Sequence, residues 1–161
     1  MLYLLDANVP IRAHSDYYPI DRIPQFWEWL IGEGNAGHVK IPFEIYGEIT
    51  DGNDMLAKWA AEKETRAALL LDEEVDTDIY NRVIGQAYAP DLNEIELEQV
   101  GRDPFLIAYA LAGEERCVVT KEVSKPSKQR GNRQVPDACD DLGVRWVTDF
   151  EFYRERDFRI E

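Results

Sequence analysis

The sequence has few cysteines and histidines, the residues that stabilise small domains through disulfides or zinc sites. It contains two cysteines, Cys117 and Cys139, which are far apart and form no C-x-x-C pair. Because a zinc site or a disulfide framework needs more numerous or closely spaced cysteines, we expect both thiols to lie in the hydrophobic core. The two histidines, His14 and His38, are distant from both cysteines in the sequence.

Long apolar runs are also missing. No segment approaches the roughly 18 consecutive apolar residues of a membrane-spanning helix, and the N-terminus lacks the basic stretch and long apolar core of a signal peptide. We therefore expect a cytoplasmic protein with no part in a membrane. No repeat and no Gly-, Ser- or Pro-rich linker divides the 161 residues, which predicts a single domain spanning 1–161.

Basic residues are in the minority. The chain has 18 Lys and Arg against 32 Asp and Glu, a net charge of -14, which argues against binding nucleic acid through the whole surface. Residues 121–133, the basic loop, hold five basic residues and one acidic residue. Since exposed charges are screened beyond about 8 Å at physiological salt, a phosphate beside this loop would interact mainly with the charges of the loop itself. The loop's composition fits a flexible, solvated segment equally well.

Short apolar runs without helical periodicity predict strands buried on both faces. Such runs lie at 2–5, 38–41, 117–120 and 144–147. Each of the last three follows a segment of helical character and a turn with glycine, a pattern typical of an α/β protein with a parallel sheet. The middle of the chain, 54–89, is predicted to be helical and to pack beside this sheet.

Acidic residues stand at four places where such a sheet would present its ligands. Two follow predicted strands, a third opens a helix, and the fourth lies one or two turns into the helix after the strand at 38–41. In open parallel sheets, ligands bind beyond the carboxyl ends of the strands, so these acids could converge on one rim. They are Asp6, Glu122, Asp103 and Glu48.

Each acid also has a purely structural explanation. Asp103 precedes a proline and is a good helix N-cap in any protein. Glu48 lies four residues after Glu44, and the pair taken in isolation favours a solvated acidic helix face. Glu122 stands in a charged loop. Asp6 is the strongest signal, because a polar side chain at the end of a doubly buried strand needs hydrogen bonds or a metal.

Four clustered carboxylates need compensation, because like charges at close range raise each other's pKa values. Mg²⁺ or Mn²⁺ prefers oxygen ligands, and paired ions activate an attacking water and stabilise the leaving oxygen in phosphodiester cleavage. Asn8 could orient Asp6, and the Thr120 hydroxyl could do the same near Glu122. Asn8 fits the N-cap of the following helix equally well.

Four sequence blocks resemble, in their order, the signature blocks of PIN-domain ribonucleases. The resemblance is closest to VapC-type toxins and to a toxin-associated PIN-like subfamily, in which a block similar to VPDACDDLGVRWV also occurs. The four blocks are LYLLDANV, IPFEIYGEI, RDPFLIAYAL and VVTKE. The resemblance implies a three-layer α/β/α fold with a central, mainly parallel sheet and an endoribonuclease that depends on Mg²⁺ or Mn²⁺. It also implies, in many members, a homodimer that a cognate antitoxin protein holds inactive.

The resemblance also assigns the site residues. Asp6, with Asn8 beside it, Glu48 and Asp103 take the places of the first three catalytic and metal-binding acids. Glu122, two residues after Thr120, takes the fourth place. Because the following loop is long and basic, the alternatives for this fourth acid are Asp137 and Asp140. Phosphates of RNA would then contact the basic residues Lys121, Lys125, Lys128, Arg130 and Arg133.

The sequence therefore predicts a metal-dependent endoribonuclease that hydrolyses RNA as the toxin of a toxin–antitoxin pair. The alternative is a catalytically silent module of the same fold, whose acidic surface binds a basic protein partner. A phosphotransfer enzyme with Asp6 as nucleophile is less favoured, because Asn8 stands where a haloacid-dehalogenase-like phosphatase has its acid.

Overall fold

A four-stranded parallel sheet forms the centre of the computed structural model, which describes all residues 1–161. The strand order is β2-β1-β3-β4, and each strand lies within one residue of its predicted run. The predicted α/β class with a parallel sheet is therefore confirmed. The strands are β1 (Leu2–Leu5), β2 (Val39–Lys40), β3 (Arg116–Val119) and β4 (Arg145–Val147).

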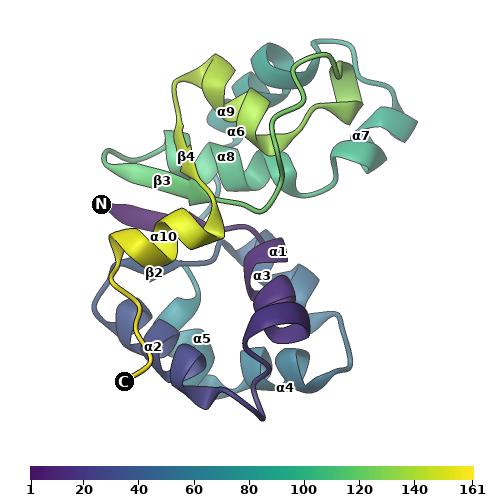
Figure 1. Ribbon diagram of the computed structural model, residues 1–161. Coiled ribbons are helices and arrows are strands. Elements are labelled where there is room, and N and C mark those ends of the chain that lie inside the picture. Colours follow the sequence, from purple (N-terminus) through teal and green to yellow (C-terminus); the bar gives the residue numbers. More distant parts are fainter.

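Ten α-helices surround the sheet (Figure 1). They are α1 (Asn8–Arg12), α2 (Pro24–Asn35), α3 (Phe43–Thr50), α4 (Met55–Ala61), α5 (Lys63–Leu69), α6 (Thr77–Val83), α7 (Glu94–Val100), α8 (Asp103–Leu111), α9 (Val135–Leu142) and α10 (Asp149–Glu155). Three short turns complete the chain: the π-helical turns η1 (Ala13–Tyr17) and η2 (Ile84–Tyr88), and the 3-10 turn η3 (Arg130–Asn132). None of the helices has the length and apolar character needed to cross a membrane.

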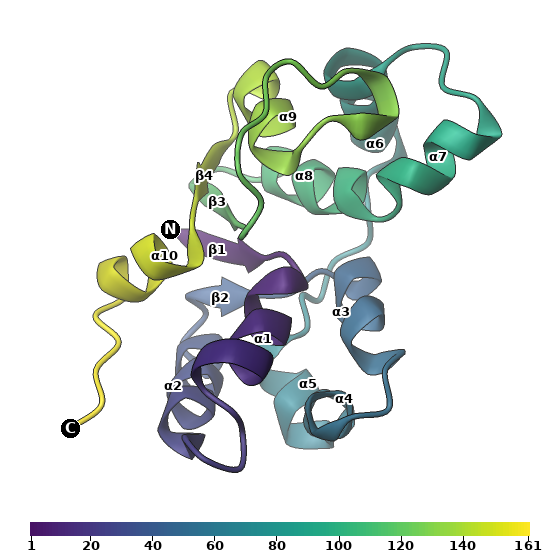
Figure 2. The same cartoon turned by 45° about the vertical axis from the view of Figure 1, so that its right-hand side comes forward.

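The helices form two layers, one on each face of the sheet. Helices α2 and α10 lie together on one face, where Phe26 of α2 contacts Tyr153 of α10 with ring centroids 5.3 Å apart. Helices α8 and α9 cover the other face, with α6 packed on α8 (Figures 1 and 2). The fold is thus a three-layer α/β/α sandwich. The middle helices pack beside the sheet as predicted, because α5 contacts both α2 and β2.

The burial of the strands explains why they could be predicted from the sequence. Leu4 and Leu5 of β1, like Val118 and Val119 of β3, are inaccessible to solvent. Strands covered by helices on both faces have no solvated side, so they form continuous apolar runs rather than alternating ones. Both cysteines are free and buried, which confirms their predicted place in the core.

The strand pairing brings distant polar residues together at one edge. Leu5 at the end of β1 is in register with Val119 at the end of β3, and the Asp6 amide donates to the Val119 carbonyl at 2.9 Å. Asp6 and Thr120 therefore leave the sheet side by side. Helices α1 and α3 begin near this same edge (Figure 2).

Candidate metal and nuclease site

A cleft of about 430 Å³ opens at the carboxyl edge of the sheet. We call it the acidic cleft, because all four acids predicted from the sequence line it. They come from the end of β1, from α3, from the start of α8 and from the segment after β3. The lining includes Asp6, Glu48, Asp103 and Glu122, together with Asn8, Arg12 and Lys121.

Asp6 is the most firmly held of these acids. Its Oδ1 accepts a hydrogen bond from the Ala7 amide at 2.8 Å. Its Oδ2 accepts one from the Thr120 hydroxyl at 2.9 Å and one from Asn8 Nδ2 at 3.2 Å. Burial raises the pKa of Asp6 to about 7, against the lowering effect of the Thr120 hydrogen bond. The charged form of Asp6 is therefore destabilised at this position.

Asn8 and Thr120 connect the ends of β1 and β3. Besides Asp6, Asn8 Nδ2 donates to Thr120 Oγ1 at 3.4 Å, and Asn8 Oδ1 accepts from the Lys121 amide at 3.1 Å. Thr120 is fully buried, and its hydroxyl accepts from the Glu122 amide at 3.1 Å. These are the contacts expected of residues that orient Asp6. The alternative N-cap role of Asn8 is wrong, because Ala7 occupies the N-cap of α1 and no side chain caps that helix.

Asp103 is the first residue of α8, and Arg102 occupies the N-cap position. The alternative that Asp103 caps this helix is therefore wrong, since no side chain accepts a hydrogen bond there. Asp103 is partly buried, and burial raises its pKa to about 9, with further contributions from the charges of Asp6, Glu122 and Glu48. A carboxylate in this position gains no capping energy and is destabilised by its neighbours.

Glu48 and Glu122 complete the acidic lining. Burial raises the pKa of Glu48, and the nearby positive charge of Arg102 acts in the opposite direction. Burial also raises the pKa of Glu122, whose Oε2 accepts a hydrogen bond from the Val135 amide at 2.9 Å. Each of the four acids thus has its charged form disfavoured by burial at the cleft.

Comparison with known proteins adds one finding to this geometry. A family model described as a domain of unknown function, DUF4411, matches residues 3–160. The chain belongs to the DUF4411 family. No curated protein and no solved structure matches it.

In this DUF4411 protein, Glu122 is the fourth acid of the cleft, and the two alternatives lie elsewhere. Asp137 is buried against the basic loop, where its carboxylate accepts from the Ser124 hydroxyl and from the Lys125 amide at 2.8 Å. Asp140 is exposed and accepts from Trp146 Nε1 at 2.9 Å. Neither carboxylate lines the acidic cleft.

Two arginines of the basic loop are held inside the DUF4411 fold. Arg130 pairs with Asp91 at 2.8 Å and with Glu96 at 2.7 Å. Arg133 pairs with Asp141 and donates to the Ala87 carbonyl at 3.0 Å. These contacts tie the loop to the segments around α7 and α9, so the two arginines are engaged by protein groups.

The three lysines of the loop differ from one another. Lys121 lines the acidic cleft, and its Nζ pairs with buried Asp149 at 2.9 Å. The same ammonium lies 4.9 Å from the ring centroid of Tyr17 and 5.0 Å from that of Phe150. Lys125 and Lys128 are exposed and form no ion pair, which leaves their charges available to an external anion.

Sequence reasoning missed three residues around the cleft. Arg12 lines it from α1 and pairs with Asp16 at 2.6 Å. Arg102 lies close enough to Glu48 to affect its pKa. Its position directly before Asp103 in the sequence was a signal that it lies near the site. Tyr88 is buried and its hydroxyl has no hydrogen-bond partner. Burial raises the pKa of Tyr88, and the Asp103 charge adds to this effect; no motif in the sequence pointed to it.

The donor set fits a hard divalent cation. All candidate ligands are carboxylate oxygens, and Asp103 is a partly buried carboxylate that does not cap its helix. No group of three or more His, Cys, Asp or Glu side chains is arranged to hold a metal ion. Mg²⁺, however, is usually bound through one or two carboxylates and keeps several waters, so it does not need three.

Proposed function

We propose that this DUF4411 protein is a metal-dependent endoribonuclease that hydrolyses RNA phosphodiester bonds at the acidic cleft. One observation carries the proposal: four acids from distant segments line one cleft where burial disfavours their charges. Such an arrangement costs folding stability, because desolvation and mutual repulsion act on the same groups. A bound divalent cation offsets both effects.

The four acids have related roles in this proposal. Asp6, Glu48, Asp103 and Glu122 would hold Mg²⁺ or Mn²⁺, one or two of them directly and the others through waters bound to the ion. The bound metal would activate a water for attack and stabilise the leaving oxygen of the phosphodiester.

Asn8 and Thr120 have a positioning role. Their hydrogen bonds to Asp6 Oδ2 hold that carboxylate in one orientation. Groups that fix a ligand in this way commonly influence metal affinity and activity by 10- to 100-fold.

RNA is the substrate proposed from the resemblance to PIN-domain ribonucleases, and the charge distribution is compatible with it. Lys121 lines the cleft, where it is paired with Asp149, and Lys125 and Lys128 follow it in the exposed loop. Phosphates that reach the cleft along this loop would meet cations before they meet the acids. The toxin role, the homodimer and the antitoxin partner rest on the resemblance alone.

The test is cleavage of a labelled single-stranded RNA by the purified protein with added Mn²⁺. We expect the wild type to cleave it and Asp6→Asn to lose the activity. Asp78→Asn is the matched control, because Asp78 is an exposed acid in the first turn of α6 and does not line the cleft. Equal cleavage by wild type and Asp6→Asn would remove Asp6 from the site. Cleavage of DNA but not RNA would overturn the proposed substrate.

A further inference from the structure

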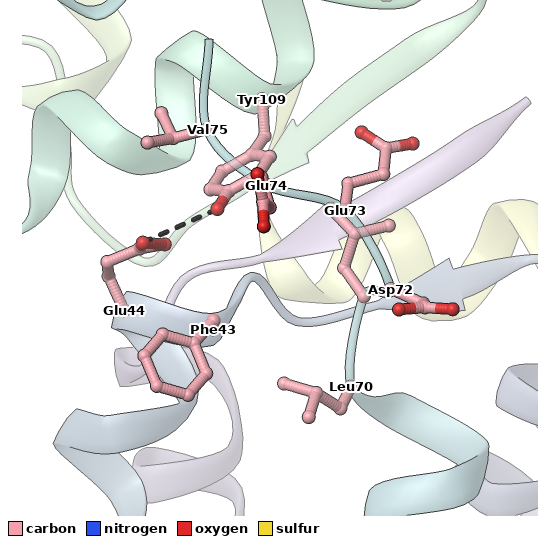
Figure 3. A pocket seen from close by; sticks show the side chains of 9 residues that line it. Phe43, Glu44, Leu70, Asp72, Glu73, Glu74, Val75 and Tyr109 are labelled. Atoms are coloured by element: carbon pink, nitrogen blue, oxygen red, sulfur yellow. Dashed lines mark hydrogen bonds between the residues drawn. The ribbon is translucent and has the colours of Figure 1, made fainter. Parts of the chain in front are cut away.

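A second cavity, of about 620 Å³, lies apart from the acidic cleft. Its walls are the start of α3, with Phe43 and Glu44, the segment 70–75, and Tyr109 of α8 (Figure 3). We call it the side cavity. The two sites have no lining residue in common, although Glu44 and Glu48 are only one turn apart on α3. The side cavity is therefore a separate feature that the proposed nuclease function does not use.

The side cavity is strongly acidic and mostly uncompensated. Four carboxylates line it, those of Glu44, Asp72, Glu73 and Glu74. Arg116 pairs with Glu73 through both of its terminal nitrogens. The other three carboxylates take part in no ion pair. Charge complementarity therefore favours a cationic occupant.

Glu44 supplies an acceptor that the protein leaves unused. Its Oε2 accepts a long hydrogen bond of 3.4 Å from the Tyr109 hydroxyl (Figure 3). Its Oε1 is inaccessible to solvent and accepts no hydrogen bond. A buried acceptor without a partner is unfavourable, and a cation that enters the cavity beside Glu44 would offset the charge of this carboxylate.

The apolar part of the lining distinguishes the kinds of cation. Phe43 is 61% exposed, and Leu70 and Val75 are partly buried beside the acids. A metal ion gains nothing from such a surface. A guanidinium stacks on an aromatic face, its methylene stem packs on apolar side chains, and its planar fork fits carboxylates. Arginine is thus the side chain that matches both halves of the cavity.

The backbone of the same wall indicates a polypeptide rather than a small cation. Leu70 forms a parallel bridge with Ile41, and the Leu71 amide donates to the Ile41 carbonyl at 3.0 Å, next to the edge strand β2. After this bridge, residues 72–75 form no backbone–backbone hydrogen bond. A row of unpaired backbone donors and acceptors is what an incoming extended segment uses when it adds to a sheet edge.

We propose that the side cavity binds an arginine side chain carried by an extended segment of a protein partner. The guanidinium enters between Glu44 and Glu74, its stem lies on Phe43, and the partner's backbone runs along residues 72–75. This inference concerns residues outside the acidic cleft, so it stands or falls independently of the nuclease proposal.

The test uses the full chain in EDTA and without RNA, so that neither metal nor substrate contributes. The probe is the capped tripeptide acetyl-Val-Arg-Val-amide, and its comparison is the same peptide with citrulline, which keeps the shape of arginine but not its charge. Binding is followed by ¹H–¹⁵N NMR titration. We expect shifts centred on residues 43–44, 70–75 and 109, and at least about fivefold weaker binding of the citrulline peptide.

A double variant locates the binding. Glu44→Gln with Glu74→Gln should weaken the arginine peptide at least about fivefold, whereas Glu28→Gln, an exposed acid of α2 outside both sites, should not. Equal binding of the two peptides overturns the proposal, and this comparison needs no variant. Shifts centred on the acidic cleft also overturn it. Spermidine or arginine amide binding as tightly as the tripeptide would overturn the assignment to a polypeptide.

Discussion

The acidic cleft and the side cavity each gather four carboxylates, yet the two sites differ in how the acids are held. In the cleft, the acids come from four distant segments, and Asp6 is only 4% exposed. In the side cavity, three of the four acids are neighbours in one exposed segment, 72–74. The comparison teaches that the number of acids does not define a site. Burial and surroundings decide which cation it favours.

The surroundings differ as clearly as the burial. Only two of the nine residues that line the cleft, Ala7 and Ile11, are apolar, and the carboxylate oxygens among the others suit a small hydrated cation. The side cavity adds Phe43, Leu70 and Val75 to its acids, which suits a cation with an apolar stem. Glu44 and Glu48 belong to different sites despite sharing one helix, so their spacing alone does not reveal a common function.

The largest expected effect concerns metal binding at the cleft. Asp103→Asn should weaken Mn²⁺ binding and RNA cleavage by about 100-fold or more, because it removes a proposed charged oxygen ligand, a loss larger than that of a ligand's hydrogen-bond partner. Isothermal titration calorimetry measures the binding without RNA, with Asp78→Asn as the control. If Asp103→Asn binds Mn²⁺ as the wild type does, Asp103 is not a metal ligand, and the contrast between a metal-binding cleft and the side cavity is not supported.

A smaller effect is expected from removing the Thr120 hydroxyl, which donates a hydrogen bond to Asp6. Thr120→Val keeps the volume but removes the hydroxyl that donates to Asp6 Oδ2, so cleavage should fall by about 10- to 100-fold. The matched control is Thr65→Val, a buried threonine of α5, which should retain wild-type cleavage. Activity of Thr120→Val equal to that of the control would show that this hydrogen bond does not position Asp6.

The buried acids also predict how the metal-free protein responds to pH. In the folded state, the pKa values of Asp6 and Asp103 are raised to about 7 and about 9, so these groups retain protons that the unfolded chain has already lost. Their contribution to stability is complete below about pH 4 and is lost as pH rises through 7 and 9.

Thermal unfolding in EDTA measures this loss. The wild-type Tm should fall by several degrees between pH 6 and pH 9, since about 1 kcal/mol corresponds to about 2–4 °C at this chain length. Asp103→Asn should flatten the dependence, whereas Asp72→Asn in the exposed side cavity should leave it unchanged. A wild-type Tm that rises over this range would contradict the assigned burial of the cleft acids.

The smallest effect concerns the basic loop. If RNA approaches along the exposed lysines, Lys125→Ala and Lys128→Ala should each reduce the slope of log affinity against log salt by about 1 or less. Arg130→Ala should leave this slope unchanged, because Arg130 is already paired with Asp91 and Glu96. Filter binding of RNA to the inactive Asp6→Asn protein at several salt concentrations measures the slopes. An equal reduction by all three variants would mean that the internal ion pairs open for RNA.

Much of the fold was predictable because its signals are local. A strand covered on both faces leaves an unbroken apolar run, as in Leu2–Leu5, and a polar residue directly after it marks the edge of the sheet. Asp6 was found in this way, whereas Thr120 was the last residue of the predicted strand at 117–120. The sequence also predicted the helices of the middle region. Helix α7, beyond that region, begins with an Asn93–Glu96 capping box.

Other features depend on distances between segments far apart in the chain. The side cavity needs Tyr109, which the sequence presents as one of many apolar positions in α8, to face Glu44 on α3. The pairing of Arg130 with Asp91 and Glu96 is equally invisible in the sequence, and it engages a residue predicted to contact RNA in internal ion pairs.

The sequence by itself determined the parallel α/β class and the acids that follow its strands, because burial patterns and strand ends depend on residues that are neighbours in the sequence. Only the tertiary structure decided that Glu122, rather than Asp137 or Asp140, joins the cleft. It also separated Glu44 from Glu48. The physical reason is that hydrogen-bond partners and desolvation depend on which elements pack together: Asp137 accepts hydrogen bonds from the basic loop, whereas Asp103 lines the cleft.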